Sequence, residues 1–141
     1  MTMDPHLSFG GQCEAAFHFY EQHLGAKILT MLTWGDSPMA SQMPADWHGK
    51  ICHATLTISG RRLMGADVPP GQYHRLAGFH MLLGLDHPAE AERLFQALAE
   101  NGSVQMPMQE TFWALRFGAV TDQFGVSWEI NCERPHAPAT A

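Results

Sequence analysis

The stretch His6–Tyr20, HLSFGGQCEAAFHFY, decides how this chain folds, because a related pattern returns at His80–Phe95 as HMLLGLDHPAEAERLF. Each copy opens with a histidine and an apolar run, has a polar residue six positions later, Gln12 or Asp86, and continues into an amphipathic helix. A module of this size buries too little apolar surface to fold well alone. We therefore expect two like modules that pack together, with chemistry where their matching positions converge.

The periodicity around these two stretches predicts one helix and four strands in each module. Apolar spacing of the helical kind favours helices at 14–23 and 88–101, and alternating or β-branched runs favour strands around them. The predicted strands lie at 6–10, 27–33, 51–58 and 62–66, and then at 79–85, 104–108, 113–120 and 126–131. We expect an α+β fold in which two βαβββ modules form a cupped mixed sheet.

The expected organisation is a single domain of two modules, followed by a short tail. Module 1 covers 1–68, a linker covers 69–77, module 2 covers 78–132 and the tail covers 133–141. The segment 34–50 combines Gly, Pro, Ser and Asp with Met and Trp, so it is too long for a turn and too apolar for a solvated linker. A lid and a contact with a partner both remain open for it.

Composition excludes several classes of function. With 141 residues, 8 basic against 14 acidic side chains and a net charge of -6, the chain has no basic patch for a phosphate backbone, so we expect no nucleic-acid partner. No apolar run approaches the roughly 18 residues of a membrane span, and the N-terminus lacks the pattern of a signal peptide. We expect no membrane partner and a cytoplasmic location.

The three cysteines, Cys13, Cys52 and Cys132, are scattered and outside any CxxC spacing. Neither a disulfide framework nor a thiolate zinc site is indicated, and reduced thiols in regular structure are expected. A nucleophilic Cys52 activated by the adjacent His53 is disfavoured, because neighbouring strand residues point to opposite faces.

Strand alternation places two histidines and a carboxylate on one wall. Leu7 and Phe9 form an apolar row that suits packing beneath a helix, which leaves His6 on the other face. The same alternation places His80 opposite its strand's apolar row, and Trp128 and Ile130 leave Glu129 on the histidine side. Singly, each of these side chains is more often structural or solvated than a ligand, so their coincidence at repeat-related positions carries the interpretation.

The motifs GGQCEAAFHFYEQHLGA (10–26) and ETFWALRFGAVTDQFGVSWEIN (110–131) resemble the vicinal oxygen chelate superfamily, and within it the PhnB-type proteins. This superfamily includes glyoxalase I, fosfomycin-resistance proteins, bleomycin-binding proteins and extradiol dioxygenases. The resemblance covers about residues 5–132. It implies paired βαβββ modules, a cupped sheet and usually a homodimer.

The resemblance also implies a metal site. In that superfamily the ligands come from the first and last strands of each module, which match His6, His80 and Glu129 here. Aligning Gly60 with Gly125 puts Met64 at the fourth ligand position, and methionine is a poor ligand for a hard divalent cation. The expected centre has three protein ligands with open positions, and Zn, Mn, Ni and Fe are not distinguished.

Two functions remain open at this stage. The first is a metal-dependent enzyme acting on a small substrate with adjacent oxygens, by lyase, isomerase, transferase or oxygenase chemistry, with Glu129 also as the candidate catalytic residue. Trp113, Arg116 and His53 are the candidate substrate-binding residues, and no general base stands out. The alternative is a metal-free protein that binds or sequesters a small ligand between apolar walls. A methyltransferase is not supported, because no GxGxxG motif follows a strand.

Overall fold

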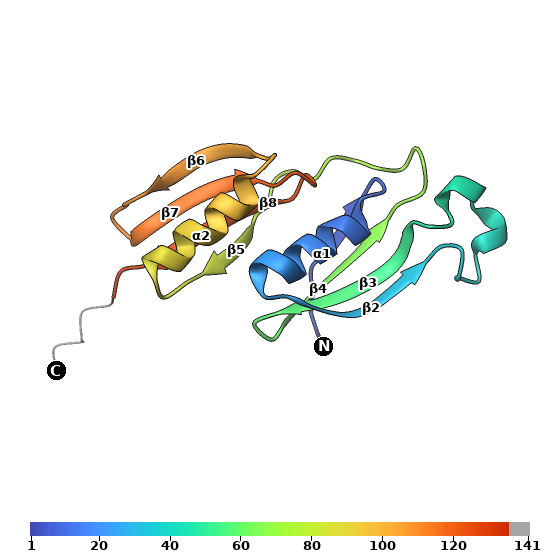
Figure 1. Ribbon diagram of the computed structural model, residues 1–141, viewed down its shortest axis with the longest axis horizontal. Coiled ribbons are helices and arrows are strands. Elements are labelled where there is room, and N and C mark those ends of the chain that lie inside the picture. Colours follow the sequence, from blue (N-terminus) through green and yellow to red (C-terminus); the bar gives the residue numbers. More distant parts are fainter. Residues whose placement is uncertain (136–141) are drawn as a thin grey trace. The chain divides into compact units, whose positions relative to one another are not determined.

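The structure is a computed structural model that describes residues 1–135, and it divides between Arg75 and Leu76 into two compact units. Each unit contains one four-stranded sheet and one helix in the order β-α-β-β-β, so the predicted α+β fold of two βαβββ modules is confirmed (Figure 1). Of the predicted tail, 133–141, only the first three residues are described. Within residues 1–135, no helix is long and apolar enough to span a membrane.

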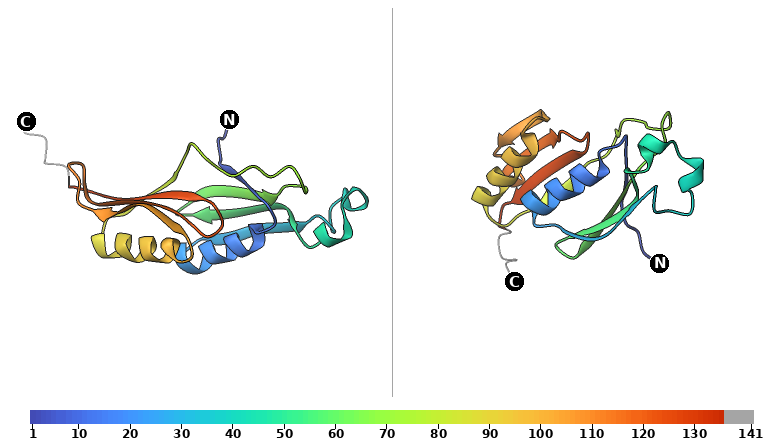
Figure 2. Two further views of the ribbon diagram at one scale, coloured as in Figure 1. Left: turned by 90° about the horizontal axis from the view of Figure 1, so that it is seen from above. Right: turned by 45° about the vertical axis from the view of Figure 1, so that its right-hand side comes forward.

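Unit 1 pairs its first strand with its last. The strand order is β1-β4-β3-β2, with β1 parallel to β4 and the other pairs antiparallel. Helix α1 lies along one face of this sheet, and the other face carries no helix of the unit (Figure 2). The elements are β1 (His6–Phe9), α1 (Cys13–Leu24), β2 (Lys27–Thr33), two 3-10 turns (Ala40–Gln42 and Ala45–Trp47), β3 (Ile51–Ile58) and β4 (Arg61–Asp67).

Helix α1 forms where the apolar stripe predicts it. Phe17 and Tyr20 are fully buried, and Phe17 meets Phe9 of β1 edge to face, with ring centroids 6.2 Å apart. The helix ends at Gly25, whose φ of 65° lies in the left-handed region that glycine adopts without strain. Beneath it, Gly65 of β4 lets the two phenylalanine rings approach the sheet backbone closely.

Unit 2 repeats this plan. The strand order is β5-β8-β7-β6, β5 is parallel to β8, and α2 covers one face (Figures 1 and 2). Helix α2 begins at Pro88, as predicted, but it ends two residues before the predicted Asn101, because Glu100 already has an extended ψ of 121°. The elements are β5 (Met81–Gly84), α2 (Pro88–Ala99), β6 (Ser103–Gln109), β7 (Ala114–Thr121) and β8 (Ser127–Glu133).

The segment 34–50 is tied down across its base. The Trp34 amide donates to the Lys50 carbonyl, at 2.8 Å, and the Gly35 amide donates to the His48 carbonyl, at 2.9 Å. The Trp34 indole Nε1 donates to the backbone oxygen of Asp67, and Lys50 Nζ donates to the Gly11 carbonyl. The segment is thus fastened to the ends of β4 and β1, and it extends past the ends of β2 and β3 (Figure 1).

Candidate functional site

Each sheet has an open face opposite its helix, and the candidate residues are distributed over these faces. In unit 1, His6 of β1 is the Cα partner of Met64 of β4, and Met64 is in turn the partner of Thr55 of β3. Leu7 and Phe9, the alternate residues of β1, are buried beneath α1, whereas His6 is exposed. The strand alternation predicted from the sequence therefore describes β1 correctly.

His6 is accompanied on this face by a second imidazole. The ring of His53, from β3, stacks on the ring of His6 with centroids 6.4 Å apart and an angle of 29° between the planes. His53 Nε2 also lies 3.3 Å from the hydroxyl oxygen of Thr55, a largely buried residue of the same strand. The open face of unit 1 thus carries a histidine pair that involves one predicted ligand and one predicted substrate-binding residue.

The open face of unit 2 carries the other two predicted ligands. Glu129 is the Cα partner of Leu82, and His80 lies just before β5, which begins at Met81. His80 Nδ1 and Glu129 Oε1 are 3.7 Å apart, and both side chains are partly exposed. The structure therefore brings these two predicted ligands together.

The two units differ in register. In unit 1 the histidine itself is the neighbour of the position that matches Glu129, which is Met64. In unit 2 that neighbour is Leu82, and the histidine stands two residues earlier. His80 therefore reaches Glu129 diagonally, across one step of the parallel ladder, and the repeat is not exact at the level of strand pairing.

Asn131, two residues after Glu129 on the same strand face, is a candidate that the sequence did not single out. It is the Cα partner of Gly84 and Phe117, it is 7 % exposed, and its side-chain oxygen has no hydrogen-bond partner. A buried acceptor left without a partner is costly and calls for an explanation. Beside it, a side chain at Gly84 would meet open space, so there is room next to this carboxamide.

Trp113 and Phe112 form an aromatic turn between β6 and β7. The Trp113 ring meets Phe112 and Phe117 edge to face, at centroid distances of 4.7 Å and 5.2 Å, and it is 42 % exposed. Phe117 is the partner of Asn131 and therefore lies on the open face. Trp113, the predicted substrate-binding residue, contacts that face through Phe117.

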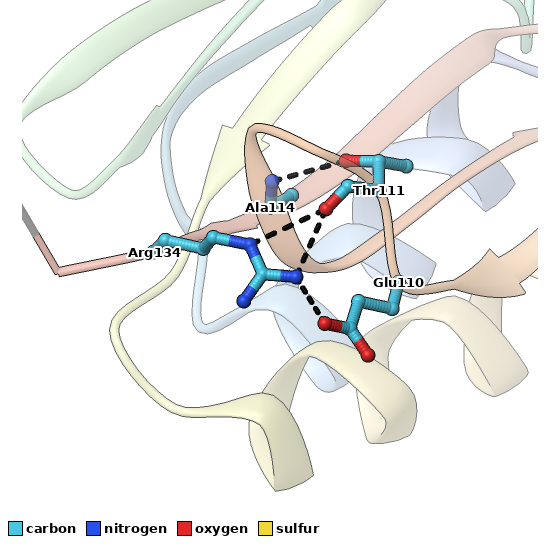
Figure 3. A network of polar contacts seen from close by, with 4 residues as sticks. All are labelled: Glu110, Thr111, Ala114 and Arg134. Atoms are coloured by element: carbon cyan, nitrogen blue, oxygen red, sulfur yellow. Dashed lines mark hydrogen bonds and ion pairs between the residues drawn. The ribbon is translucent and has the colours of Figure 1, made fainter.

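The turn itself is held by a network of polar contacts. The Arg134 guanidinium pairs with Glu110 and donates to the Thr111 carbonyl, and the Ala114 amide donates to the Thr111 hydroxyl (Figure 3). A side chain from the end of the chain therefore fixes the aromatic turn in place.

Arg116, the other candidate on β7, is placed differently. Its Cα partner is Cys132, on the face that packs against α2, and its guanidinium bonds to Glu92 of that helix and to the Met108 carbonyl. The structure does not bring Arg116 together with Glu129.

Cys13 has no nucleophilic character in this environment. Its side chain is fully buried, and burial together with the neighbouring negative charge of Asp67 raises the pKa of the thiol far above its usual range. The thiol stays protonated at neutral pH, so thiolate chemistry at this position is excluded.

Within residues 1–135, no group of three or more His, Cys, Asp and Glu side chains is arranged to hold a metal ion. His80 and Glu129 form a pair in unit 2, and His6 belongs to unit 1. The three-ligand centre therefore stays a prediction.

The chain matches the Glyoxalase/Bleomycin resistance protein/Dioxygenase superfamily over residues 3–130. The chain belongs to this superfamily. The resemblance found in the two sequence motifs, to the vicinal oxygen chelate proteins, is thereby confirmed. The match includes both units, with all three predicted metal ligands.

Relatives of this superfamily member cover nearly its whole length. Protein YjdN from Escherichia coli is 38% identical over 139 residues, which are 93% of this chain and 95% of that protein. The crystal structure of protein PA1353 from Pseudomonas aeruginosa is 49% identical and superposes with a TM-score of 0.86, over 96% of this chain and 99% of that one. These similarities support the fold along the whole chain.

Two more distant structures agree in fold alone. The PhnB protein from Bacillus cereus is 22% identical with a TM-score of 0.80, over 94% of this chain and 99% of that one. A FosX fosfomycin resistance protein from Listeria monocytogenes, solved as a complex with Mn(II) and a dihydroxypropylphosphonic acid, is 10% identical with a TM-score of 0.64, over 95% and 93% of the two chains. A PhnB protein is thus among the structural neighbours of this superfamily member.

Proposed function

We propose that this protein is a divalent-metal-dependent enzyme that acts on a small substrate with two adjacent oxygens. The observation that carries the proposal is the pair formed by His80 and Glu129, whose nearest atoms are 3.7 Å apart on an open sheet face. This distance exceeds an ordinary hydrogen bond and suits two groups that would share a cation.

The donor set fits such an ion. His80 and Glu129, with His6 as the third ligand expected from the repeat, offer two imidazoles and one carboxylate, a set that Zn, Mn, Ni and Fe all accept. Three protein ligands leave positions for substrate oxygens. A bound ion would act there as a Lewis acid that polarises those oxygens.

The surrounding side chains have roles that do not depend on the metal. Glu129 supplies the carboxylate beside the reacting centre and is the proposed catalytic residue. Trp113 and Phe117 offer an aromatic wall for the apolar part of a substrate, on the face to which Glu129 belongs. Arg116 is already paired with Glu92, so substrate recognition through it would require that pair to open.

The substrate class is supported by the superfamily's known ligand chemistry and by one structural neighbour. The FosX protein is described with Mn(II) and a dihydroxypropylphosphonic acid, a molecule with two hydroxyl groups on neighbouring carbons. We transfer to this chain only the class, a small molecule whose adjacent oxygens can bind one ion.

The test is metal analysis and metal binding. Protein purified without chelator is analysed for bound metals, then stripped and titrated with Zn²⁺, Mn²⁺, Ni²⁺ and anaerobic Fe²⁺. We expect one ion per chain in the wild type, and loss of binding in His80→Ala and Glu129→Gln. Matched controls in the same unit are His87→Ala and Glu100→Gln, which remove exposed groups of the same kinds. Wild-type protein that takes up none of these ions would refute the proposal.

The second candidate is a metal-free protein that sequesters a small apolar ligand. It is favoured by exposed apolar side chains of unit 2, since Leu82, the Cα partner of Glu129, is 57 % exposed and Phe112, in the turn between β6 and β7, is 90 % exposed. Unchanged ligand binding in His80→Ala and Glu129→Gln, with no metal in the wild type, would support this candidate against the enzyme.

The proposal also includes a homodimer and a cytoplasmic location. Dimers are common in this superfamily, and the outer strands β1 and β2 of unit 1 leave sheet edges that another copy can cover. Sedimentation equilibrium measures the mass directly, and a mass of 15.6 kDa at all concentrations would refute the dimer.

A further inference from the structure

Asn131 is fixed by its backbone, whereas its side-chain oxygen has nothing to bind. The Asn131 carbonyl accepts a hydrogen bond from the Leu85 amide at 2.8 Å, and its Cα partners are Gly84 on one side and Phe117 on the other. The residue is 7 % exposed, and its Oδ1 is buried with no hydrogen-bond partner among residues 1–135. A well-paired strand position therefore presents an unused acceptor.

An acceptor in this state lowers the stability of the fold. Folding has taken Oδ1 out of water without giving it a new hydrogen bond. Nearly all buried polar groups of native proteins have a partner, either in the protein or in a bound molecule. Because unit 2 supplies no donor for Oδ1, the donor must come from a group outside the unit.

Space for such a group lies beside Gly84. A Cβ atom at Gly84 would have no atom within 4 Å, apart from those of its chain neighbours. Gly84 and Asn131 are partners in a ladder, so this Cβ would point to the same face as the Asn131 side chain. A group that enters beside Gly84 can meet Oδ1 once the carboxamide turns about χ2, a torsion that is broad for asparagine.

Asn131 also lies between two features of the open face of unit 2. Glu129, which is close to His80, is two residues earlier on β8, about 7 Å along the strand. Phe117, the partner of Asn131 on β7, contacts the ring of Trp113 with centroids 5.2 Å apart. A ligand that reaches Asn131 therefore meets a carboxylate and an imidazole on one side and aromatic rings on the other.

We propose that Asn131 is a ligand-binding residue, whose Oδ1 accepts a hydrogen bond from a hydroxyl group of a small molecule on the open face of unit 2. The ligand class is a small molecule with an apolar part, for the rings of Phe117 and Trp113, and at least one free hydroxyl. An ether or ketone oxygen in the same place would leave Oδ1 without a donor. The inference goes beyond the proposed function, because it assigns a contact to the ligand and does not depend on a bound ion.

The experiment compares two probes, 1-phenylethane-1,2-diol and its dimethyl ether, by NMR titration of metal-stripped full-length protein. The probes share the aromatic ring and the two adjacent oxygens, but only the diol has O–H donors. We expect the wild type to bind the diol about two- to tenfold more tightly than the ether, as one hydrogen bond allows. Asn131→Leu should bring the two affinities close together. Asn131→Asp keeps an acceptor at the same place and should keep the preference for the diol.

Two further variants test the place of binding. Gly84→Val should weaken the binding of both probes while the fold is retained, because the new side chain would occupy the space beside the carboxamide. Gln105→Leu, which removes an exposed carboxamide of β6 in the same unit, is the matched control and should change neither affinity. Circular dichroism of each variant verifies that the fold is retained.

The preference for the diol is the decisive measurement, since a purely structural role of Asn131 would not change it. Equal preference in the wild type and in Asn131→Leu overturns the inference, and so does a wild type that binds neither probe at millimolar concentration. Metal uptake with equal preference overturns only this inference and leaves the proposed enzyme standing. The expected preferences in a protein that takes up no metal ion support the inference and refute the proposed enzyme.

Discussion

Replacing Asp67 by asparagine changes the side chain's shape very little, but it should make unit 1 much easier to unfold. Asp67 ends β4, is 1 % exposed, and accepts three backbone hydrogen bonds. Its Oδ1 accepts from the Gly11 amide at 2.9 Å and the Cys13 amide at 3.0 Å, and its Oδ2 accepts from the Ile51 amide at 2.8 Å. One carboxylate therefore fixes the start of α1 and the start of β3.

The magnitude follows from these three bonds. In Asp67→Asn the amide oxygen can keep the bonds from Gly11 and Cys13, but an NH₂ group then faces the Ile51 N–H. One hydrogen bond to a charged group, worth about 1.5–3 kcal/mol, is lost, and the other two fall toward the neutral value of about 0.5–1.5 kcal/mol. We expect the free energy of unfolding to fall by about 3–5 kcal/mol, a large part of the ~5–15 kcal/mol typical of a domain.

Urea unfolding followed by far-UV circular dichroism measures this loss. Asp46→Asn, at an exposed position in the same unit, is the control and should change stability by less than about 0.5 kcal/mol. If Asp67→Asn costs less than about 1 kcal/mol, the carboxylate does not hold the two segments together as the hydrogen bonds indicate.

Four further predictions concern other residues. Cys13 should resist a thiol reagent at pH 8 while the partly exposed Cys52 reacts, because burial raises the pKa of Cys13. A mass-spectrometric time course in which Cys13 is labelled faster than Cys52 would contradict this. The raised pKa of Cys13 also makes stability depend on pH. The neutral buried thiol contributes fully to stability below its unfolded pKa of about 8.5, and the contribution is lost as the pH rises above that value. The free energy of unfolding measured from pH 8 to 10 should therefore decline. Asn131→Leu should leave stability unchanged or raise it, since a buried acceptor without a partner costs about 1–3 kcal/mol, and a loss above about 1 kcal/mol in urea unfolding would show that the oxygen is satisfied. Gly65→Ala should cost about 1–3 kcal/mol, because the new methyl would lie 2.8 Å from Phe17 Cζ and 3.2 Å from Phe9 Cε2; a wild-type melting temperature would refute the tight packing.

The fold could be predicted from the sequence because its signals are local. The apolar stripe of α1, the proline at the start of α2 and the alternation around His6 each depend on residues close together in the chain. The strand face on which Arg116 lies is also predictable, because Arg116 is four residues from Val120 and Val120 pairs with Trp128 on the helix side. Alternation along β7 then predicts that Arg116 points toward α2.

The details of the candidate site depend on distant pairings, which local patterns do not contain. The Cα partner of Glu129 is Leu82 and not His80. This pairing is set by the register of β5 on β8, and the two strands are more than forty residues apart in the sequence. The stacking of His6 on His53 requires β4 to lie between β1 and β3. The three amides that Asp67 binds come from segments 16 to 56 residues away in sequence. No spacing rule within one segment predicts these contacts.

The two-residue register difference between the units suggests a route for protein engineering. A Met64→Glu substitution would give unit 1 a carboxylate directly across the ladder from His6, an arrangement that the duplicated half lacks because Leu82 occupies the corresponding place. The pair His6 and Met64 of unit 1 thus corresponds to Leu82 and Glu129 of unit 2, and Met64→Glu would give both units a carboxylate at the matching position.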